Sequence, residues 1–120
     1  MKVKLQNVYQ VTRDMDRALG FYRDVLGMTL KFRDAGKWSQ LQAAGSNVAL
    51  SSPEEAAAGA TGTVMVLEVE DLDEVREQLE AAGTSVVELR EVTHGRTLTC
   101  RDPDGNLLQI FARKAPKPAS

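Results

Sequence analysis

The feature that most constrains the fold of this chain is an internal repeat. The segment that starts at Val8 reads VYQVTRDMDRAL, and the segment that starts at Met65 reads MVLEVEDLDEVR, so the two copies are offset by 57 positions. In each copy an apolar run is followed by two aspartates in a D-x-D arrangement and then by a helical pattern. The sequence therefore predicts two copies of one structural unit.

Each copy is predicted to contain one helix that starts at its D-x-D pair. Asp14 and Asp71 suit the N-cap position, because a carboxylate accepts the free N–H groups of the first turn and faces the positive end of the helix dipole. The apolar residues that recur at helical spacing are Met15, Leu19, Tyr22 and Leu26 in the first copy and Leu72, Val75, Leu79 and Ala82 in the second. We expect helices over 14–26 and 71–82, each packed on a sheet by one face.

Three strand-like segments follow each predicted helix. They are residues 29–33, 37–43 and 47–51 in the first copy and residues 85–89, 96–101 and 106–112 in the second. Asp102-Pro-Asp-Gly105 is a strong hairpin signal, because proline fixes φ and glycine accepts a positive φ. The prediction is an α+β fold of two β-α-β-β-β modules related by a pseudo-twofold axis, with a curved mixed sheet around a cleft and the helices outside.

The composition of the intervening segments predicts the module boundaries. The first module is expected over 1–52, a linker over 53–63, the second module over 64–113, and a flexible polar tail over 114–120. A chain of 120 residues is expected to form one structural domain overall.

Composition also excludes several classes of protein. The chain has 15 Lys and Arg against 17 Asp and Glu, so it lacks the basic field that nucleic-acid binding requires. Cys100 is the single cysteine, which excludes an intrachain disulfide, and no apolar run approaches a membrane span or a signal sequence. We expect a cytoplasmic protein with neither nucleic acid nor membrane as a partner.

Two motifs indicate a family. Phe21-Tyr-Arg-Asp-Val-Leu-Gly27 follows the first D-x-D pair, and Asp102-Pro-Asp-Gly-Asn106 lies in the last hairpin. With these motifs nearly the whole chain resembles the vicinal oxygen chelate superfamily, which includes glyoxalases, extradiol dioxygenases, and bleomycin- and fosfomycin-resistance proteins. The resemblance implies a ligand cleft and, for a chain of this length, a homodimer. The motifs are capping, turn and packing residues, so they specify the fold more than the chemistry.

The resemblance also implies where a metal would be bound. Family members with a metal place His, Gln or Glu at the start of the first strand of each half and near the middle of its last strand. The matching positions here are Asn7, Leu50, Val64 and Gln109. Two neutral amides and two hydrocarbons do not form a ligand set for a divalent ion. We therefore predict no metal and no cofactor.

Strand alternation predicts a set of ligand-binding residues. The residues expected on one surface are Asn7, Tyr9, Val64, Val66, Glu68, Gln109 and Phe111, with Trp38 and Arg96 at the rim. A mostly apolar surface with a few polar groups is typical of a small-molecule pocket. Trp38 is interpreted either as a core side chain or as a stacking wall for a flat ligand.

The leading hypothesis is a metal-free small-molecule binding protein of the glyoxalase/bleomycin-resistance type, with sequestration of a toxic organic compound as one use. The alternatives are a glyoxalase-like lyase or isomerase with Glu68 as the base, a dioxygenase-like metal enzyme with atypical ligands, and a module that binds a partner protein. His94, the single histidine, is interpreted as a turn residue. The sequence leaves open the ligand, whether catalysis occurs, and whether the modules pair within one chain or between chains.

Overall fold

The protein was analysed as a computed structural model that describes residues 2, 6–56, 64–92 and 95–114. The chain divides into two compact units, Met1–Thr63 and Val64–Ser120. His94 and most of the predicted linker and tail lie outside the described residues.

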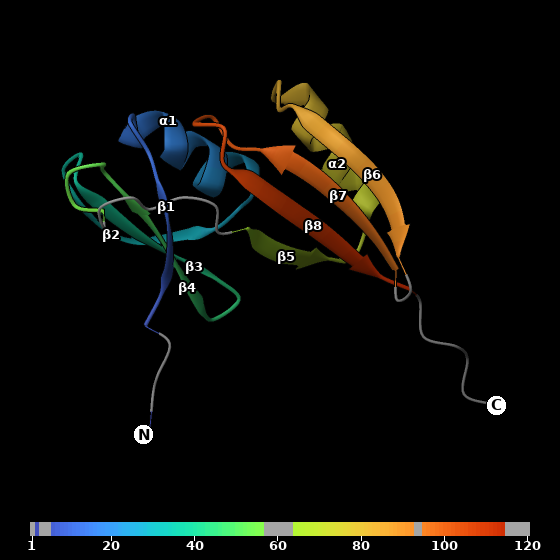
Figure 1. The fold of residues 1–120 in the computed structure, drawn as a ribbon, viewed down its shortest axis with the longest axis horizontal. Coiled ribbons are helices and arrows are strands. Elements are labelled where there is room, and N and C mark those ends of the chain that lie inside the picture. Colours follow the sequence, from blue (N-terminus) through green and yellow to red (C-terminus); the bar gives the residue numbers. More distant parts are fainter. Residues whose placement is uncertain (1, 3–5, 57–63, 93–94, 115–120) are drawn as a thin grey trace. The chain divides into compact units, whose positions relative to one another are not determined.

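The first unit has the predicted order of elements. It contains β1 (Val8–Val11), α1 (Met15–Leu19), η1 (Gly20–Val25), β2 (Thr29–Asp34), β3 (Trp38–Ala43) and β4 (Ser46–Ser51). The strands form a mixed sheet in the order β1-β4-β3-β2, in which β1 runs parallel to β4 and the other pairs are antiparallel (Figure 1).

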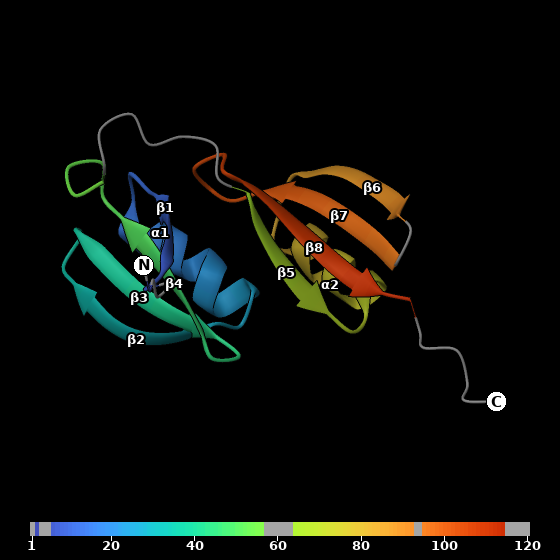
Figure 2. The ribbon, with the colours of Figure 1, turned by 60° about the horizontal axis from the view of Figure 1, so that its bottom comes forward.

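The second unit repeats this arrangement. It contains β5 (Met65–Val69), α2 (Leu72–Ala81), β6 (Val86–Val92), β7 (Gly95–Arg101) and β8 (Leu107–Arg113). Its sheet has the order β5-β8-β7-β6, with β5 parallel to β8 and β6 at the opposite edge (Figure 2). The predicted α+β class with two β-α-β-β-β modules is therefore confirmed.

Both predicted helix caps are present. The Oδ1 atom of Asp14 accepts a hydrogen bond from the backbone N–H of Arg17 at 3.1 Å, and the Oδ1 atom of Asp71 accepts one from Glu74, also at 3.1 Å. Both cap residues have extended backbone, as an N-cap requires. The repeat thus sets the start of the helix in each unit.

The second aspartate of each D-x-D pair connects the helix to its sheet. Asp16 forms an ion pair with Arg33 of β2 at 2.7 Å, and Asp73 forms one with Arg96 of β7 at 3.1 Å. The two aspartates are largely accessible to solvent and the two arginines are partly accessible, so each pair contributes little to stability. The pairs do show which face of each sheet the helix covers.

The first helix differs from the continuous α-helix that the sequence predicts. After Leu19 it continues as the π-helix η1, in which the N–H of Leu26 donates to the carbonyl oxygen of Phe21 at 2.9 Å. Phe21 and Tyr22 are both buried, with ring centroids 5.2 Å apart in an edge-to-face arrangement. The wider turn allows two consecutive aromatic side chains to pack in the core.

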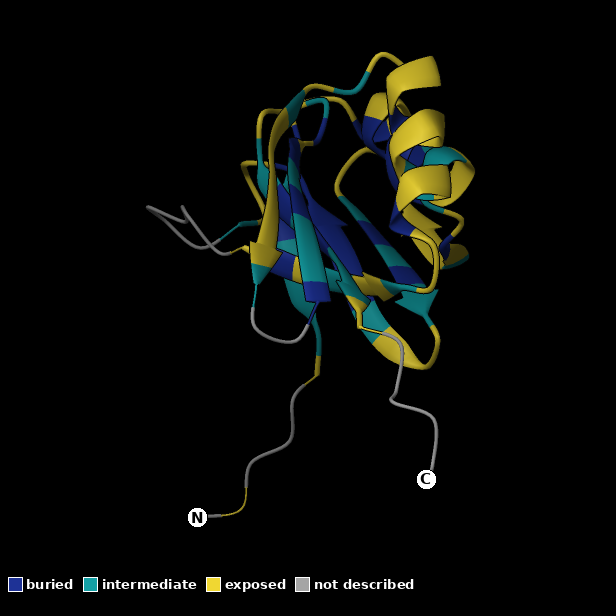
Figure 3. Cartoon of the chain, turned by 90° about the vertical axis from the view of Figure 1, so that its right-hand side faces the viewer, coloured by how far each residue is buried: buried dark blue, intermediate teal, exposed yellow. Residues whose placement is uncertain are grey.

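The core of each unit lies between its helix and one face of its sheet. The buried apolar side chains of the first unit include Met15, Leu19, Tyr22, Leu41, Val48 and Leu50, and those of the second include Leu72, Leu79, Leu98, Leu108 and Ile110. The helices are exposed on their outer sides and buried toward the strands (Figure 3). We call the other face of each sheet its open face. Among the described residues, no helix is both long and apolar enough to cross a membrane.

Candidate functional site

The open face of the first sheet is centred on an aromatic pair. The rings of Tyr9 on β1 and Trp38 on β3 have centroids 5.5 Å apart and planes at 63°, and both side chains are half-buried. On the intervening strand β4, the register places Ala49 beside Tyr9 and Ser51 beside Trp38. Both of these small neighbours are fully buried, so the accessible surface here belongs to the half-buried rings. Two of the predicted ligand residues are therefore in contact.

Amide side chains extend this face beyond the aromatic pair. The amide of Gln42 on β3 donates to the side-chain oxygen of Asn47 on β4 at 3.3 Å, and Gln40 lies between Gln42 and Trp38 on the same face of β3. Asn7 directly precedes β1 and is half-buried. The three polar residues of β3 and β4 were missed by the sequence reasoning, although counting alternate positions from Trp38 finds both glutamines.

The open face of the second sheet begins with exposed aliphatic side chains. Val64 is 43% exposed, and Val66 on β5 is 58% exposed. The parallel register with β8 places Val66 beside Gln109 and Glu68 beside Phe111. Met65, which has the opposite parity on β5, is buried toward the helix. Five of the predicted ligand residues thus share one face by alternation.

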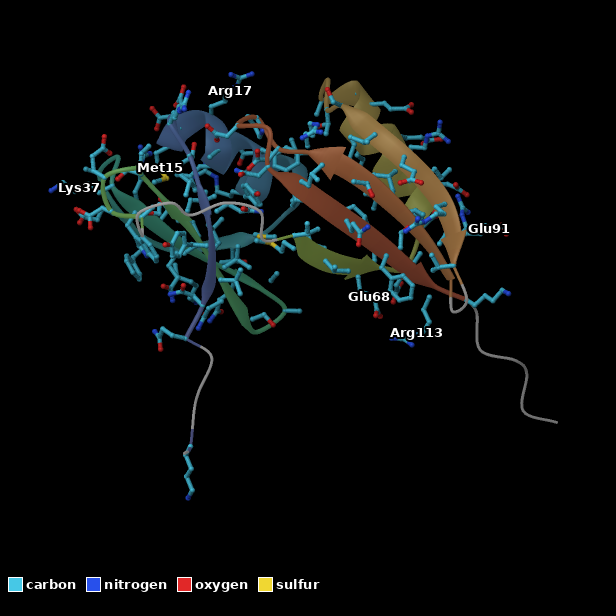
Figure 4. All side chains as sticks on the ribbon, in the orientation of Figure 1. Met15, Arg17, Lys37, Glu68, Glu91 and Arg113 are labelled. Carbon is cyan, nitrogen blue, oxygen red and sulfur yellow. The ribbon has the colours of Figure 1, made fainter. Side chains whose placement is uncertain are left out.

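Glu68 has a cationic partner on this face. A guanidinium nitrogen of Arg113 on β8 lies 3.2 Å from the Glu68 carboxylate (Figure 4). The guanidinium carbon of Arg113 lies 5.6 Å from the ring centroid of Phe111. Both charged side chains are more than half exposed. Glu68 is therefore an exposed, ion-paired carboxylate, whereas a general base is expected to be desolvated or close to a reacting group.

Polar residues continue the open face across β7. The amide of Gln109 on β8 donates to the hydroxyl of Thr99 at 3.5 Å, which is at the long limit for a hydrogen bond. Thr97 of β7 is paired with Phe111 of β8. On the opposite edge of β7, Glu88 of β6 is paired with Thr99 and Arg90 with Thr97. The sequence reasoning did not identify these four residues. Glu88 and Arg90 were missed because β6 has no clean alternation, whereas counting alternate positions on β7 finds both threonines.

Arg96 does not lie with the other predicted residues of the second unit. On β7 it shares a face with Leu98 and Cys100, which are completely buried toward the helix, and it forms the ion pair with Asp73 of α2. Arg96 was expected at the rim of the ligand surface, but it lies on the helix side of the sheet. The cause is strand parity, since residues two apart on a strand point to the same side.

Leu50 also lies on the helix side. It is fully buried. Tyr9 and Val66 are equivalent positions in the two repeats, and Tyr9 is paired with Ala49 whereas Val66 is paired with Gln109. The residue of β4 that is equivalent to Gln109 is therefore Ala49. The predicted position was wrong by one residue. The chemistry is unchanged, since a methyl group donates nothing to a metal.

The donor set does not fit a metal in either unit. The first unit offers the amide of Asn7 and the methyl group of Ala49, and the second offers the isopropyl group of Val64 and the amide of Gln109. Divalent ions in such sites require imidazole or carboxylate ligands. Within the ranges that the structure describes, no three His, Cys, Asp or Glu side chains form a cluster suited to a metal ion.

Cys100 is not placed for nucleophilic chemistry. Its side chain is completely buried under the helix, and burial, followed by the nearby Asp102 carboxylate, raises the pKa of the thiol to about 11. A thiol with this pKa is protonated at neutral pH, whereas the thiolate is the reactive form. Cys100 is a core residue.

Comparisons with known proteins agree with this architecture. Residues 4–110 match the Glyoxalase/Bleomycin resistance protein/Dioxygenase superfamily. An uncharacterised protein of Mycolicibacterium smegmatis is 28% identical over 103 residues, which are 84% of this chain and 86% of that protein.

Two solved structures show the same fold. Lactoylglutathione lyase from Agrobacterium tumefaciens has a TM-score of 0.78 at 22% identity, covering 92% of this chain and 94% of that chain. The bleomycin-binding protein from Streptomyces verticillus, solved with copper(II)-bleomycin, has a TM-score of 0.70 at 22% identity, covering 95% and 99%. Since the superfamily match spans most of the sequence, the chain belongs to the Glyoxalase/Bleomycin resistance protein/Dioxygenase superfamily.

Proposed function

We propose that this protein is a metal-free binding protein for a small organic molecule, with the two open faces as the ligand-contacting surfaces. The observation that carries the proposal is the chemistry of those faces. They combine aromatic and aliphatic side chains with neutral amides, and the positions where relatives would hold a metal offer no charged ligand. Apolar surface with a few placed polar groups is typical of small-molecule sites.

The first open face favours a flat ligand. The rings of Tyr9 and Trp38 are arranged edge to face, and both are only half-buried, so part of their surface is accessible to a ligand. An aromatic ligand group gains both burial and stacking on such a surface. The neighbouring glutamines of β3 offer donors and acceptors to a ligand that carries amide groups.

The second open face favours the same ligand class. Val66 presents apolar area beside Gln109, and the amide of Gln109 has only a long bond to Thr99 in this structure. A side-chain amide has two N–H donors and an acceptor oxygen, so Gln109 retains capacity for a ligand.

Binding is favoured over catalysis by the state of the candidate catalytic groups. Glu68 is ion-paired and exposed, Cys100 is buried and protonated, and the metal positions lack suitable donors. The copper(II)-bleomycin complex of the Streptomyces verticillus protein shows that a relative with this fold holds an organic ligand. We also propose that the protein acts in the cytoplasm, as a homodimer, and that sequestration of a toxic compound is one use.

A fluorescence titration tests the proposed ligand surface. The probes are metal-free bleomycin and a panel of aromatic, amide-bearing natural products, added to the purified protein while Trp38 emission is recorded. We expect at least one compound to quench the emission saturably. Gln40→Leu, on the same face of β3 as Trp38, should weaken its binding roughly 5- to 150-fold, because a lost buried hydrogen bond costs on the order of 1–3 kcal/mol.

Two further variants serve as controls for this titration. Lys37 lies outside the open faces, so Lys37→Ala should leave the affinity unchanged. Tyr9→Ala should weaken binding, and because Trp38 is retained its emission still reports the titration. A panel in which no compound changes the emission or the melting temperature would contradict the proposal.

A further inference from the structure

The exposed edge of the second sheet has the composition of a self-complementary interface. Strand β6 occupies this edge (Figure 2), and its central residues are all exposed. Val87 is 51% exposed and Leu89 is 40% exposed. An edge strand presents unpaired N–H and C=O groups, and proteins usually protect such edges with charged side chains, proline, a short strand or a bulge. Here the strand is seven residues long and has no proline, and its charged side chains are of both signs, so a second copy can pair with them.

The ladder between β6 and β7 is regular over most of the strand. A bulge separates Val86 from Glu88, and from Glu88 to Val92 every residue has a register partner on β7. Glu88 and Arg90 have the same parity and pair with threonines of the open face, so both side chains lie on that face. In the described part of the chain neither takes part in an ion pair, unlike Arg113 or Arg96.

We propose that β6 pairs with β6 of a second copy, antiparallel and centred on Leu89. In this register Glu88 lies opposite Arg90 of the second copy, and the twofold axis repeats the same pair on the other side. Leu89 lies opposite its own equivalent and covers exposed aliphatic surface. Two opposite-charge pairs and one apolar pair therefore stabilise the same alignment.

Repulsion between like charges disfavours the two neighbouring registers of this strand pair. A twofold axis at Glu88 places two carboxylates opposite each other, and an axis at Arg90 places two guanidinium groups opposite each other. Directly opposed like charges destabilise a strand pair. The equivalent edge strand of the first unit, β2, is also unsuitable, since an axis at Phe32 sets Lys31 against Arg33 of the second copy. Charge complementarity therefore favours β6 over β2, and the register centred on Leu89 over those centred on Glu88 or Arg90.

The proposed pairing also has a consequence for the ligand surface. A twofold axis perpendicular to the sheet keeps both open faces on the same side, so the two four-stranded sheets join into one continuous surface of eight strands. The interface is small compared with standard protein interfaces, so we expect reversible dimers with micromolar affinity. The inference rests on the homodimer part of the proposed function and adds the residues that form the contact.

Sedimentation equilibrium of charge-reversal variants tests this interface. Glu88→Lys and Arg90→Glu each convert both opposite-charge pairs into like-charge pairs, and each should raise the dimer Kd roughly thirtyfold. An equimolar mixture of the two variants should form a heterodimer, since lysine and arginine on one chain then face two glutamates on the other. The double variant Glu88→Lys/Arg90→Glu should recover the homodimer.

A matched control has the same change in charge at another exposed position. Glu77→Lys on the outer side of α2 should leave the dimer Kd unchanged. A wild-type protein that stays monomeric at hundreds of micromolar would overturn both this interface and the proposed homodimer. A dimer whose Kd is insensitive to both reversals would overturn the interface alone. A series of larger oligomers would show head-to-tail association, and would also contradict the twofold pairing.

Discussion

Replacing Asp102 with alanine is expected to lower the free energy of unfolding by about 2–4 kcal/mol. The Asp102 carboxylate is buried and accepts hydrogen bonds from the backbone N–H of Asp104 at 2.9 Å and from the backbone and side-chain amides of Asn106, each at 2.8 Å. Alanine removes the acceptor of these hydrogen bonds at the turn that joins β7 to β8. Urea denaturation followed by circular dichroism measures the change.

The variant Asp102→Asn separates the parts of this network. Asparagine keeps one side-chain acceptor oxygen for the two backbone donors, but its NH₂ group faces the amide of Asn106. Its stability should therefore fall between the wild type and Asp102→Ala. If alanine cost less than about 1 kcal/mol, the carboxylate would not be holding the hairpin together.

Replacing Gly95 with alanine is expected to destabilise the protein by about 2–4 kcal/mol. Gly95 starts β7 and is paired with Val92 on one side and Arg113 on the other. A Cβ atom at this position would collide with the backbone carbonyl oxygen of Ala112 and would lie 3.1 Å from the Cα of Arg113. Backbone atoms of a paired strand cannot move aside without disturbing the ladder, so thermal unfolding should occur roughly 10 °C lower.

Gly20→Ala provides the matched control for this prediction. Gly20 lies within the first helix at φ −55°, and a Cβ atom there meets nothing within 4 Å. Alanine should stabilise the protein by about 0.5–1 kcal/mol, because it restricts the unfolded chain and has a higher helix propensity. Equal effects of the two substitutions would contradict the steric account of Gly95.

The repeated local features of the fold could be predicted from the sequence. The caps at Asp14 and Asp71 use short-range hydrogen bonds, and the helix-ending glycines Gly27 and Gly83 both have a positive φ. Such features depend on a few adjacent residues, and their occurrence in both copies strengthens each prediction. The π-helical turn around Phe21 was not predictable in the same way, because it follows from how two adjacent aromatic side chains pack in the core.

The candidate site was predictable wherever strand alternation is clear. On β5, exposed Val66 and Glu68 alternate with buried Met65, so the two residues share one face as alternation predicts. On β4 both faces are buried around Ala49 and Leu50, so hydrophobicity could not set the register, and the position was misjudged by one residue. For Arg96 the information was available, since it shares its parity with buried Leu98 and Cys100.

Native mass spectrometry of the freshly purified protein tests the central claim most directly, because it reports bound metal and bound organic ligand in one spectrum. A protein with amides and hydrocarbons at the metal positions should show the mass of the chain without a stoichiometric metal, and added zinc, nickel or manganese should produce no one-to-one adduct that survives a chelator. A species that retains one transition-metal ion per chain would contradict the account, and would make a metal enzyme the better description.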